Sequence, residues 1–179
     1  LIHIAAEGET IIGPLTQSAA GLPLNWNSLP GVSLIDDIDS VLWRKLAING
    51  CINPLTVKYD CLYGELLDGS EREDHLTRVA TEIEALSRSL ERPLFHTSLI
   101  DEVRRVARLT HSNVSSMLQD IRAGRSTEIN QISGTLCTMA KQRGIDLPES
   151  DALLHFIQQS EQGSTPVESL SVVIRSQLT

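Results

Sequence analysis

Apolar residues recur every three or four positions along most of the chain after residue 36, which is the period of an amphipathic helix. The clearest stripe is Leu76, Val79, Ile83 and Leu86, and it predicts a long helix over about 70–92, capped by Ser70 and stopped by Pro93. Similar stripes predict helices over about 98–109, 115–122, 126–144 and 148–159. The pattern from 36 onward is therefore helical.

A further helix is expected from about 36 to 51, because three aspartates precede its apolar run and favour a helix start. Pro54 is expected to end or kink this helix, since the residue before a proline avoids the α region. A second short helix is predicted over about 54–60.

The first 35 residues have a different pattern. Short β-prone runs at 1–4 and 10–12 predict a hairpin, and residues 32–35 predict one more short strand. An isolated hairpin is marginal in water, so this small sheet is expected to pack on something upstream. We predict a mainly α fold with three parts: a β segment over 1–35, a helical domain over 36–162 and a tail over 163–179.

Composition narrows the functional classes. The chain has 179 residues, of which 41% are hydrophobic and 21% charged, with a net charge of −8. An acidic chain is a poor nucleic-acid binder, because phosphate neutralisation needs clustered Lys and Arg. No apolar run reaches the roughly 18 residues of a membrane span, so we expect a cytoplasmic protein. Three cysteines without CxxC spacing and five dispersed histidines predict neither a metal site nor a disulfide framework.

The most informative segment is LWRKLAINGCIN, within residues 42–53. At about 100° per residue, Lys45, Asn49 and Asn53 fall in one quadrant of a helix that is apolar on most other faces. A lysine on such a helix needs a partner or a cleft, since burying an unpaired ammonium is costly. Beside two carboxamides it would suit a polar substrate, and partial desolvation would lower its pKa toward the range useful for proton transfer. Alternatively, Lys45 reaches solvent along its stem and Asn53 only shapes the turn before Pro54.

Two other segments are weaker candidates. Residues 113–117 open a helix, where free N–H groups and hydroxyls suit a carboxylate or phosphate, although ordinary capping by Ser115 or Ser112 is the favoured interpretation. Glu128 lies in the first turn of another predicted helix, and stabilisation by the helix dipole is again the simpler explanation. No GxGxxG loop is present to bind a dinucleotide.

Four segments in this order resemble successive blocks of the ketopantoate reductase family: LWRKLAINGCINPLT, CLYGELL, SSMLQDIRAGRSTEIN and RGIDLPE. The resemblance covers about residues 1–160. It implies a helical domain like the C-terminal domain of 6-phosphogluconate dehydrogenase, preceded by the last β hairpin of a Rossmann-type nucleotide domain. It also implies reduction of the 2-oxo acid ketopantoate to pantoate with NADPH, in pantothenate and coenzyme A synthesis.

The resemblance assigns roles by position. Lys45 matches the lysine that protonates the ketone oxygen, and Glu128 matches an acid that touches the cofactor. The positions that match substrate-binding groups are Asn49, Asn53, Asn113 and Ser116. NADP would be bound mostly by the absent half, so the fragment alone is expected to be inactive.

Some positions depart from the family pattern. Tyr63 stands where the family frequently has Asn, so a substrate contact there is altered. Gly50 replaces a more usual small thiol or apolar residue and loosens its helix by up to ~1 kcal/mol relative to Ala. Two alternatives therefore stay open: a reductase of another 2-oxo acid, and a helical dimerisation or interaction module with a vestigial site. A small-molecule 2-oxo acid is the predicted partner, and a homodimer is a further candidate.

Overall fold

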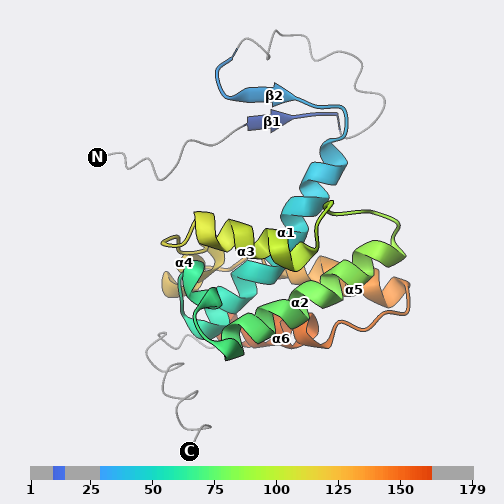
Figure 1. The fold of residues 1–179 in the computed structure, drawn as a ribbon. Helices are drawn as coiled ribbons and strands as arrows, with labels where there is room; N and C mark the ends of the chain where they lie inside the picture. The colour runs from blue at the N-terminus through green and yellow to red at the C-terminus, as the bar shows by residue number, and fades with distance from the viewer. Residues whose placement is uncertain (1–9, 15–28, 163–179) are drawn as a thin grey trace, which may run out of the picture. The chain divides into compact units, whose positions relative to one another are not determined.

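The computed structural model describes residues 10–14 and 29–162, and Figure 1 shows their elements. The chain divides into two compact units, Leu1–Arg44 and Lys45–Thr179. The divisions predicted near residues 35 and 162 remain predictions.

The first unit contains a two-stranded sheet of β1 (Thr10–Ile12) and β2 (Val32–Leu34). The strands are parallel, with Thr10 opposite Val32 and Ile12 opposite Leu34. The strand predicted at 1–4, and with it the expected hairpin, lies outside the described residues. Gly13 permits a close approach at the end of β1, because a Cβ there would lie 2.6 Å from the carbonyl oxygen of Ile35.

Helix α1 (Ile38–Tyr59) begins in the first unit and continues into the second. The Asp37 carboxylate accepts a hydrogen bond from the Ser40 N–H at 3.1 Å, as an N-cap does. The prediction of separate helices on either side of Pro54 was wrong, since α1 runs through this proline without a break. A proline removes one helical hydrogen bond, and burial of every residue from 51 to 57 offsets that loss.

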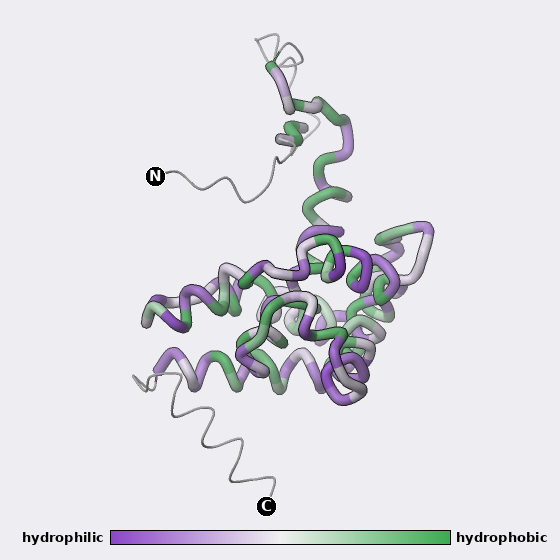
Figure 2. Tube along the Cα trace, turned by 60° about the vertical axis from the view of Figure 1, so that its left-hand side comes forward, coloured by the Kyte–Doolittle hydropathy of each residue, from purple (hydrophilic) through white to green (hydrophobic). Residues whose placement is uncertain are grey.

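The other helical elements lie in the second unit. They are η2 (Gly64–Leu67), α2 (Ser70–Ser89), α3 (Leu99–Leu109), α4 (Ser116–Arg122), η3 (Asn130–Gly134), α5 (Thr135–Gln142) and α6 (Pro148–Gln162). Helix α2 is central, because it contacts α3, α5, α6 and η2. Its predicted stripe of Leu76, Val79, Ile83 and Leu86 is fully buried. Hydrophobic and hydrophilic residues are interspersed along the helical segments, as in amphipathic helices (Figure 2). The predicted helical fold is confirmed.

The predicted helix caps had mixed outcomes. Ser115 caps α4 as predicted, with its hydroxyl accepting from the N–H group of residue 118. Ser98, for which no capping role was predicted, caps α3 in the same way, accepting from the N–H group of residue 101. Ser70 is instead the first helical residue of α2, and its cap is Gly69 at φ 103°, a conformation that other residues avoid. Helix α2 also ends at Ser89, before the predicted stop.

The helix predicted over 126–144 contains a wider turn. Residues 130–134 form η3, a turn of π-helix, before α5 continues as an α-helix. An extra residue in one turn rotates the helix surface that follows. Cys137 and Ala140 are therefore buried on α5 together with Leu136, whereas Met139 of the predicted stripe is only half-buried.

The start of α6 is held by a side chain from α2. The Glu82 carboxylate accepts hydrogen bonds from the N–H groups of Glu149 and Ser150, at 2.7 and 3.0 Å, and from the Ser150 hydroxyl at 2.8 Å. Two N–H groups that have no partner inside the helix are satisfied in this way. Glu82 thus acts as an N-cap supplied by another helix.

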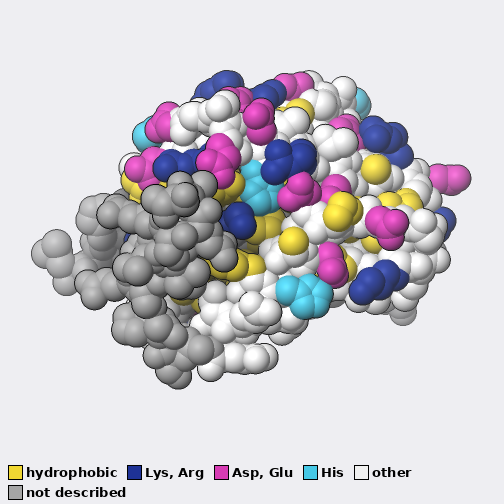
Figure 3. All heavy atoms as spheres, turned by 90° about the horizontal axis from the view of Figure 1, so that it is seen from below, with side chains coloured by type: hydrophobic (Ala, Val, Ile, Leu, Met, Phe, Trp, Pro, Cys, Tyr) yellow, Lys and Arg dark blue, Asp and Glu magenta, His cyan; other side chains and the backbone are white. Residues whose placement is uncertain are grey.

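Charged side chains of both signs are interspersed on the face drawn in Figure 3. Several form ion pairs between elements, among them Arg78 with Glu149 and Arg122 with Asp60. These pairs are exposed, and such pairs contribute about 0–1 kcal/mol each. The second unit is held mainly by its apolar core.

Candidate functional site

Helix α1 carries three predicted site residues, Lys45, Asn49 and Asn53, spaced four residues apart. Four residues advance about 6 Å along a helix, so the three Cα atoms follow one side of α1 in a nearly straight row. Their burial increases along the row: Lys45 is exposed, Asn49 half-buried and Asn53 only 3% exposed. The row therefore runs from solvent into the core of the second unit.

Lys45 is more open than the apolar pattern around it predicts. Leu42, one turn earlier, is also 46% exposed, so this side of α1 is open to solvent. Among the described residues none forms a hydrogen bond or ion pair with the Lys45 ammonium. Its charge is available to a bound anion or to a developing alkoxide.

Asn53 and Asn113 are both bonded to Tyr63. The Tyr63 hydroxyl donates to Asn53 Oδ1 at 3.2 Å, and the Tyr63 N–H donates to the Asn113 carbonyl at 3.0 Å. The next N–H, of Gly64, donates to the carbonyl of His111 at 3.0 Å. The segment between α1 and η2 thus ties the second half of α1 to the loop before α4.

A second connection joins α1 to the same loop. The hydroxyls of Thr56 and Ser115 lie 2.6 Å apart, both fully buried. Thr56 donates its only hydroxyl hydrogen to the Asn53 carbonyl at 2.7 Å, so Ser115 must be the donor to Thr56. Ser115 in turn accepts from the Leu118 N–H at 2.9 Å. The chain of hydrogen bonds runs in one direction, from α4 to the backbone of α1.

Ser116 and Glu128 lie outside this network of hydrogen bonds. Ser116 is exposed and follows the buried Ser115 at the start of α4. Glu128 is exposed just before η3, and its carbonyl accepts a hydrogen bond from the Ile132 N–H at 2.9 Å. Ile129 and Ile132 pack in a cluster that Leu46 and Val114 flank, so these segments share one core. No contact between the Glu128 carboxylate and Lys45 is recorded in the described part of the chain.

Sequence reasoning missed the roles of Thr56 and Ser115 in this polar cluster. From the sequence, Ser115 is expected only to cap a helix, and Thr56 has no predicted role. A weak signal was available, because a hydroxyl three residues after Asn53 on a buried helix needs a hydrogen-bond partner. The partner is 59 residues away, and spacing alone does not identify it.

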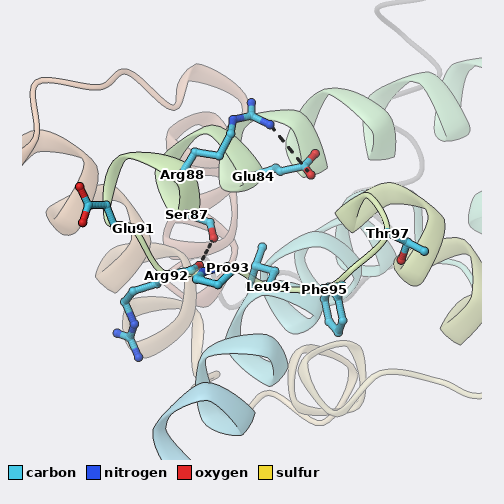
Figure 4. Close-up of a pocket in the computed structure, with 9 residues that line it drawn as sticks. All are labelled: Glu84, Ser87, Arg88, Glu91, Arg92, Pro93, Leu94, Phe95 and Thr97. Carbon is cyan, nitrogen blue, oxygen red and sulfur yellow. Dashed lines mark hydrogen bonds and ion pairs between the residues drawn. The ribbon is translucent and has the colours of Figure 1, made fainter.

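A different cavity, of about 280 Å³, lies at the end of α2 (Figure 4). Its walls include Ser87, whose hydroxyl bonds the Arg92 carbonyl, and Arg88, which pairs with Glu84 at 4.0 Å. None of the predicted site residues lines it. This cavity is separate from the cluster around Asn53.

One buried histidine joins three helices elsewhere in the second unit. His75 on α2 lies 3.0 Å from the Tyr59 hydroxyl through Nδ1, and 3.1 Å from Glu149 Oε2 through Nε2. The Nε2 contact is not aligned as a hydrogen bond, so this nitrogen has no hydrogen-bond partner among the residues that the structure describes. Burial lowers the pKa of His75, against the opposing effect of the Glu149 charge. The histidine is therefore held neutral.

Within the residues that the structure describes, neither a membrane-spanning helix nor a metal-binding cluster is present. No helix there is long and apolar enough to cross a membrane. No group of three or more His, Cys, Asp or Glu side chains is placed to hold a metal ion.

Comparison with known proteins identifies the family. Residues 37–161 match the family described as "Ketopantoate reductase PanE/ApbA C terminal". The chain belongs to the ketopantoate reductase family. The match includes all of α1 and every later helix except the last residue of α6. It therefore covers the row from Lys45 to Asn53 and the loop before α4.

Relatives support this assignment. The chain is 39% identical over 168 residues to 2-dehydropantoate 2-reductase of Shigella flexneri, covering 90% of this chain and 53% of that protein. A similar protein of Archaeoglobus fulgidus is 33% identical over 130 residues, covering 72% and 43%. The chain thus spans about half the length of the curated relatives it matches.

Solved structures agree. A PanE/ApbA family ketopantoate reductase from Ralstonia eutropha superposes with a TM-score of 0.75 at 26% identity, covering 88% of this chain and 52% of that one. A D-mandelate dehydrogenase solved with NADH and anilino(oxo)acetate superposes with a TM-score of 0.67 at 24% identity, covering 79% and 45%. At that identity, the second similarity concerns the fold alone.

Proposed function

We propose that this chain is the catalytic, substrate-binding half of an NADPH-dependent 2-dehydropantoate 2-reductase, which reduces ketopantoate to pantoate. The observation that carries the proposal is the α1 row, in which an exposed ammonium stands one and two turns before two carboxamides. The family match supports the same assignment, and so do the relatives named 2-dehydropantoate 2-reductase. Activity of the fragment by itself is not expected.

Lys45 is the proposed general acid. Reduction of a ketone places negative charge on its oxygen, and a nearby ammonium stabilises that charge and then donates a proton to it. Lys45 has no competing acid among the described residues, so its three N–H donors are free for this oxygen. The lysine regains a proton from solvent, to which its side chain is exposed.

The amides and hydroxyl of the site are proposed to orient the 2-oxo acid. The side-chain amides of Asn49 and Asn53 donate hydrogen bonds to the oxygens of the oxo acid. Asn113 and Ser116 make further polar contacts with it at the start of α4. Holding the carbonyl within reach of Lys45 is the part of catalysis that these residues supply.

NADPH, when bound, supplies the hydride. The described residues fit only part of this cofactor. The exposed Glu128 carboxylate accepts hydrogen bonds and so suits a ribose hydroxyl, but its charge repels phosphates. We propose NADPH as the cofactor in preference to NADH, and ketopantoate as the substrate in preference to other 2-oxo acids. Another 2-oxo acid is the second candidate substrate, because Tyr63 stands where the family frequently has Asn and is bonded to Asn53.

The test uses the full-length protein that contains this chain, followed by loss of NADPH absorbance with ketopantoate. Lys45→Ala is expected to lower kcat by about 100-fold or more, the usual contribution of a positioned general acid. Lys58→Ala is the matched control, because this lysine of the same helix faces the Phe156 ring at 5.3 Å and is not in the row. Unchanged turnover of Lys45→Ala at saturating substrate would reject the proton-donor role.

A second measurement separates an enzyme from an interaction module with a vestigial site. Ketopantoate and pantoate, each added with NADPH, are expected to raise the melting temperature of the full-length protein, because ligands that bind only the folded state stabilise it. A melting temperature that neither compound changes would favour the interaction module.

A further inference from the structure

Tyr63 forms hydrogen bonds through both its side-chain hydroxyl and its backbone N–H. Its hydroxyl donates to Asn53 Oδ1 at 3.2 Å, and its backbone N–H donates to the Asn113 carbonyl at 3.0 Å. These two asparagines come from α1 and from the loop before α4. Tyr63 is thus the residue through which two parts of the proposed substrate site contact each other.

The bond to Oδ1 fixes how the Asn53 carboxamide is turned. A carboxamide has one oxygen that accepts and one NH₂ group that donates two hydrogens. Because Tyr63 engages the oxygen, the NH₂ group is the end that remains for another partner. No described residue accepts a hydrogen bond from Asn53 Nδ2. Both donors are therefore available to an oxygen of a bound oxo acid.

The position of Tyr63 is itself restrained. The Gly64 N–H donates to the His111 carbonyl at 3.0 Å, and the Leu62 N–H donates to Glu65 Oε2 at 2.6 Å. Gly64 also lies directly against the His111 ring, since a Cβ there would be 2.0 Å from Cδ2. With residues on both sides of Tyr63 bonded, its hydroxyl is presented to Asn53 from a fixed backbone.

The hydroxyl also keeps its hydrogen. Burial raises the pKa of Tyr63 above its ordinary value near 10, so the side chain stays a donor throughout the physiological range. The hydroxyl can therefore donate to the Asn53 amide oxygen, as it does in the structure, at every pH in that range.

We propose that Tyr63 is a positioning residue of the reductase site, whose hydroxyl holds Asn53 so that its amide N–H groups face an oxygen of the 2-oxo acid. The inference rests on the proposed function and extends it to a residue that does not itself touch substrate. It predicts an effect on substrate binding that passes through Asn53 and disappears when Asn53 no longer donates.

The experiment measures KM and kcat for ketopantoate in the full-length protein with NADPH. Tyr63→Phe removes only the hydroxyl and is expected to raise KM about three- to tenfold, the effect of one hydrogen bond, with kcat changed less than twofold. Tyr59→Phe is the matched control, because that hydroxyl bonds His75 instead, and its KM is expected to stay unchanged.

The deciding comparison repeats Tyr63→Phe in an Asn53→Ala background, where KM is already raised. No further rise in KM is expected there, because the group that Tyr63 positions is gone. If Asn53→Ala does not fold, as judged by its melting temperature, Asn53→Asp takes its place, since it keeps the oxygen and loses the N–H donors. The same absence of a further effect is expected.

Two results would overturn the inference alone: an unchanged KM in Tyr63→Phe, or effects of Tyr63→Phe that are equal in the presence and absence of the Asn53 amide. A merely structural tyrosine would give the second result, with a lower melting temperature in both backgrounds. If the unaltered protein does not reduce ketopantoate or any other 2-oxo acid, the proposed function and this inference both fall.

Discussion

Replacing Glu82 by alanine should destabilise the chain far more than an ordinary surface substitution. The carboxylate of this half-buried residue accepts three hydrogen bonds at the start of α6, two from backbone N–H groups and one from the buried Ser150 hydroxyl. Hydrogen bonds to charged groups contribute about 1.5–3 kcal/mol each, but losses at one site overlap and water reaches a half-buried site. Loss of a helix cap alone costs about 0.5–2 kcal/mol. We therefore expect a loss of about 2–4 kcal/mol.

Urea or thermal unfolding followed by circular dichroism measures this loss. At roughly 2–4 °C per kcal/mol for a chain of this size, the middle of the range corresponds to a fall of about 6–12 °C in melting temperature. Glu84→Ala is the matched control on the same helix, because its pair with Arg88 is long, at 4.0 Å, and exposed; it should change stability by less than about 0.5 kcal/mol. Equal effects of the two substitutions would refute the role of Glu82 as a cap for α6.

Three other substitutions or treatments test features of the fold. Burial lowers the pKa of His75 below 6.5, so the unfolded chain binds the proton more tightly; stability should fall as the pH drops below about 6.5, and the fall should be smaller in His75→Gln. The same pH dependence in both proteins would contradict this. Gly64→Ala places a Cβ against the His111 ring and should cost about 1–3 kcal/mol in urea unfolding, the usual penalty for overpacking; a stability equal to the unaltered chain would show that the ring moves freely. Burial raises the pKa of the Cys51 thiol, and all three cysteines are buried, so a thiol reagent at neutral pH should label them only on unfolding; rapid labelling of the native chain would argue against their burial.

The helices could be predicted from sequence wherever one face packs on a continuous core. The stripe on α2 illustrates this, because its four apolar residues all reach zero exposure and their spacing matches the helix period. The failure at Pro54 has a physical reason as well. The residue before a proline avoids the helical conformation when only local geometry matters. Here burial of the whole segment around Pro54 outweighs that preference, and this burial depends on residues distant in the sequence.

The candidate site was predictable along α1 and not across the fold. The four-residue spacing of Lys45, Asn49 and Asn53 is a property of one helix, and the structure places them in a row. The bond between Tyr63 and Asn53 depends on how the chain turns after α1, and that turn is set by contacts with residues 111 and 113. Such contacts follow from tertiary packing, which spacing does not encode.

Gly50 shows how structure changes the interpretation of a sequence feature. Its lack of a side chain weakens α1 as an isolated helix. In the folded chain a Cβ at this position would lie 2.7 Å from Leu136 Cδ1 and 3.2 Å from Ile83 Cδ1. The glycine therefore allows α1 to approach α2 and α5 closely, one turn before Asn53.

The hydrogen bond between Thr56 and Ser115 joins residues 59 positions apart, and this separation determines when during synthesis the candidate site can form. During synthesis Asn53 and Thr56 emerge well before Ser115, with α2 and α3 still to be made between them. Until the later segment is synthesised, the polar groups of α1 are hydrated. The entropy lost in closing so long a loop is offset only when the intervening helices pack. The site should therefore form late, in the same cooperative step as the core, and a ribosome-bound chain that ends before α4 should contain the residues of α1 without a binding site.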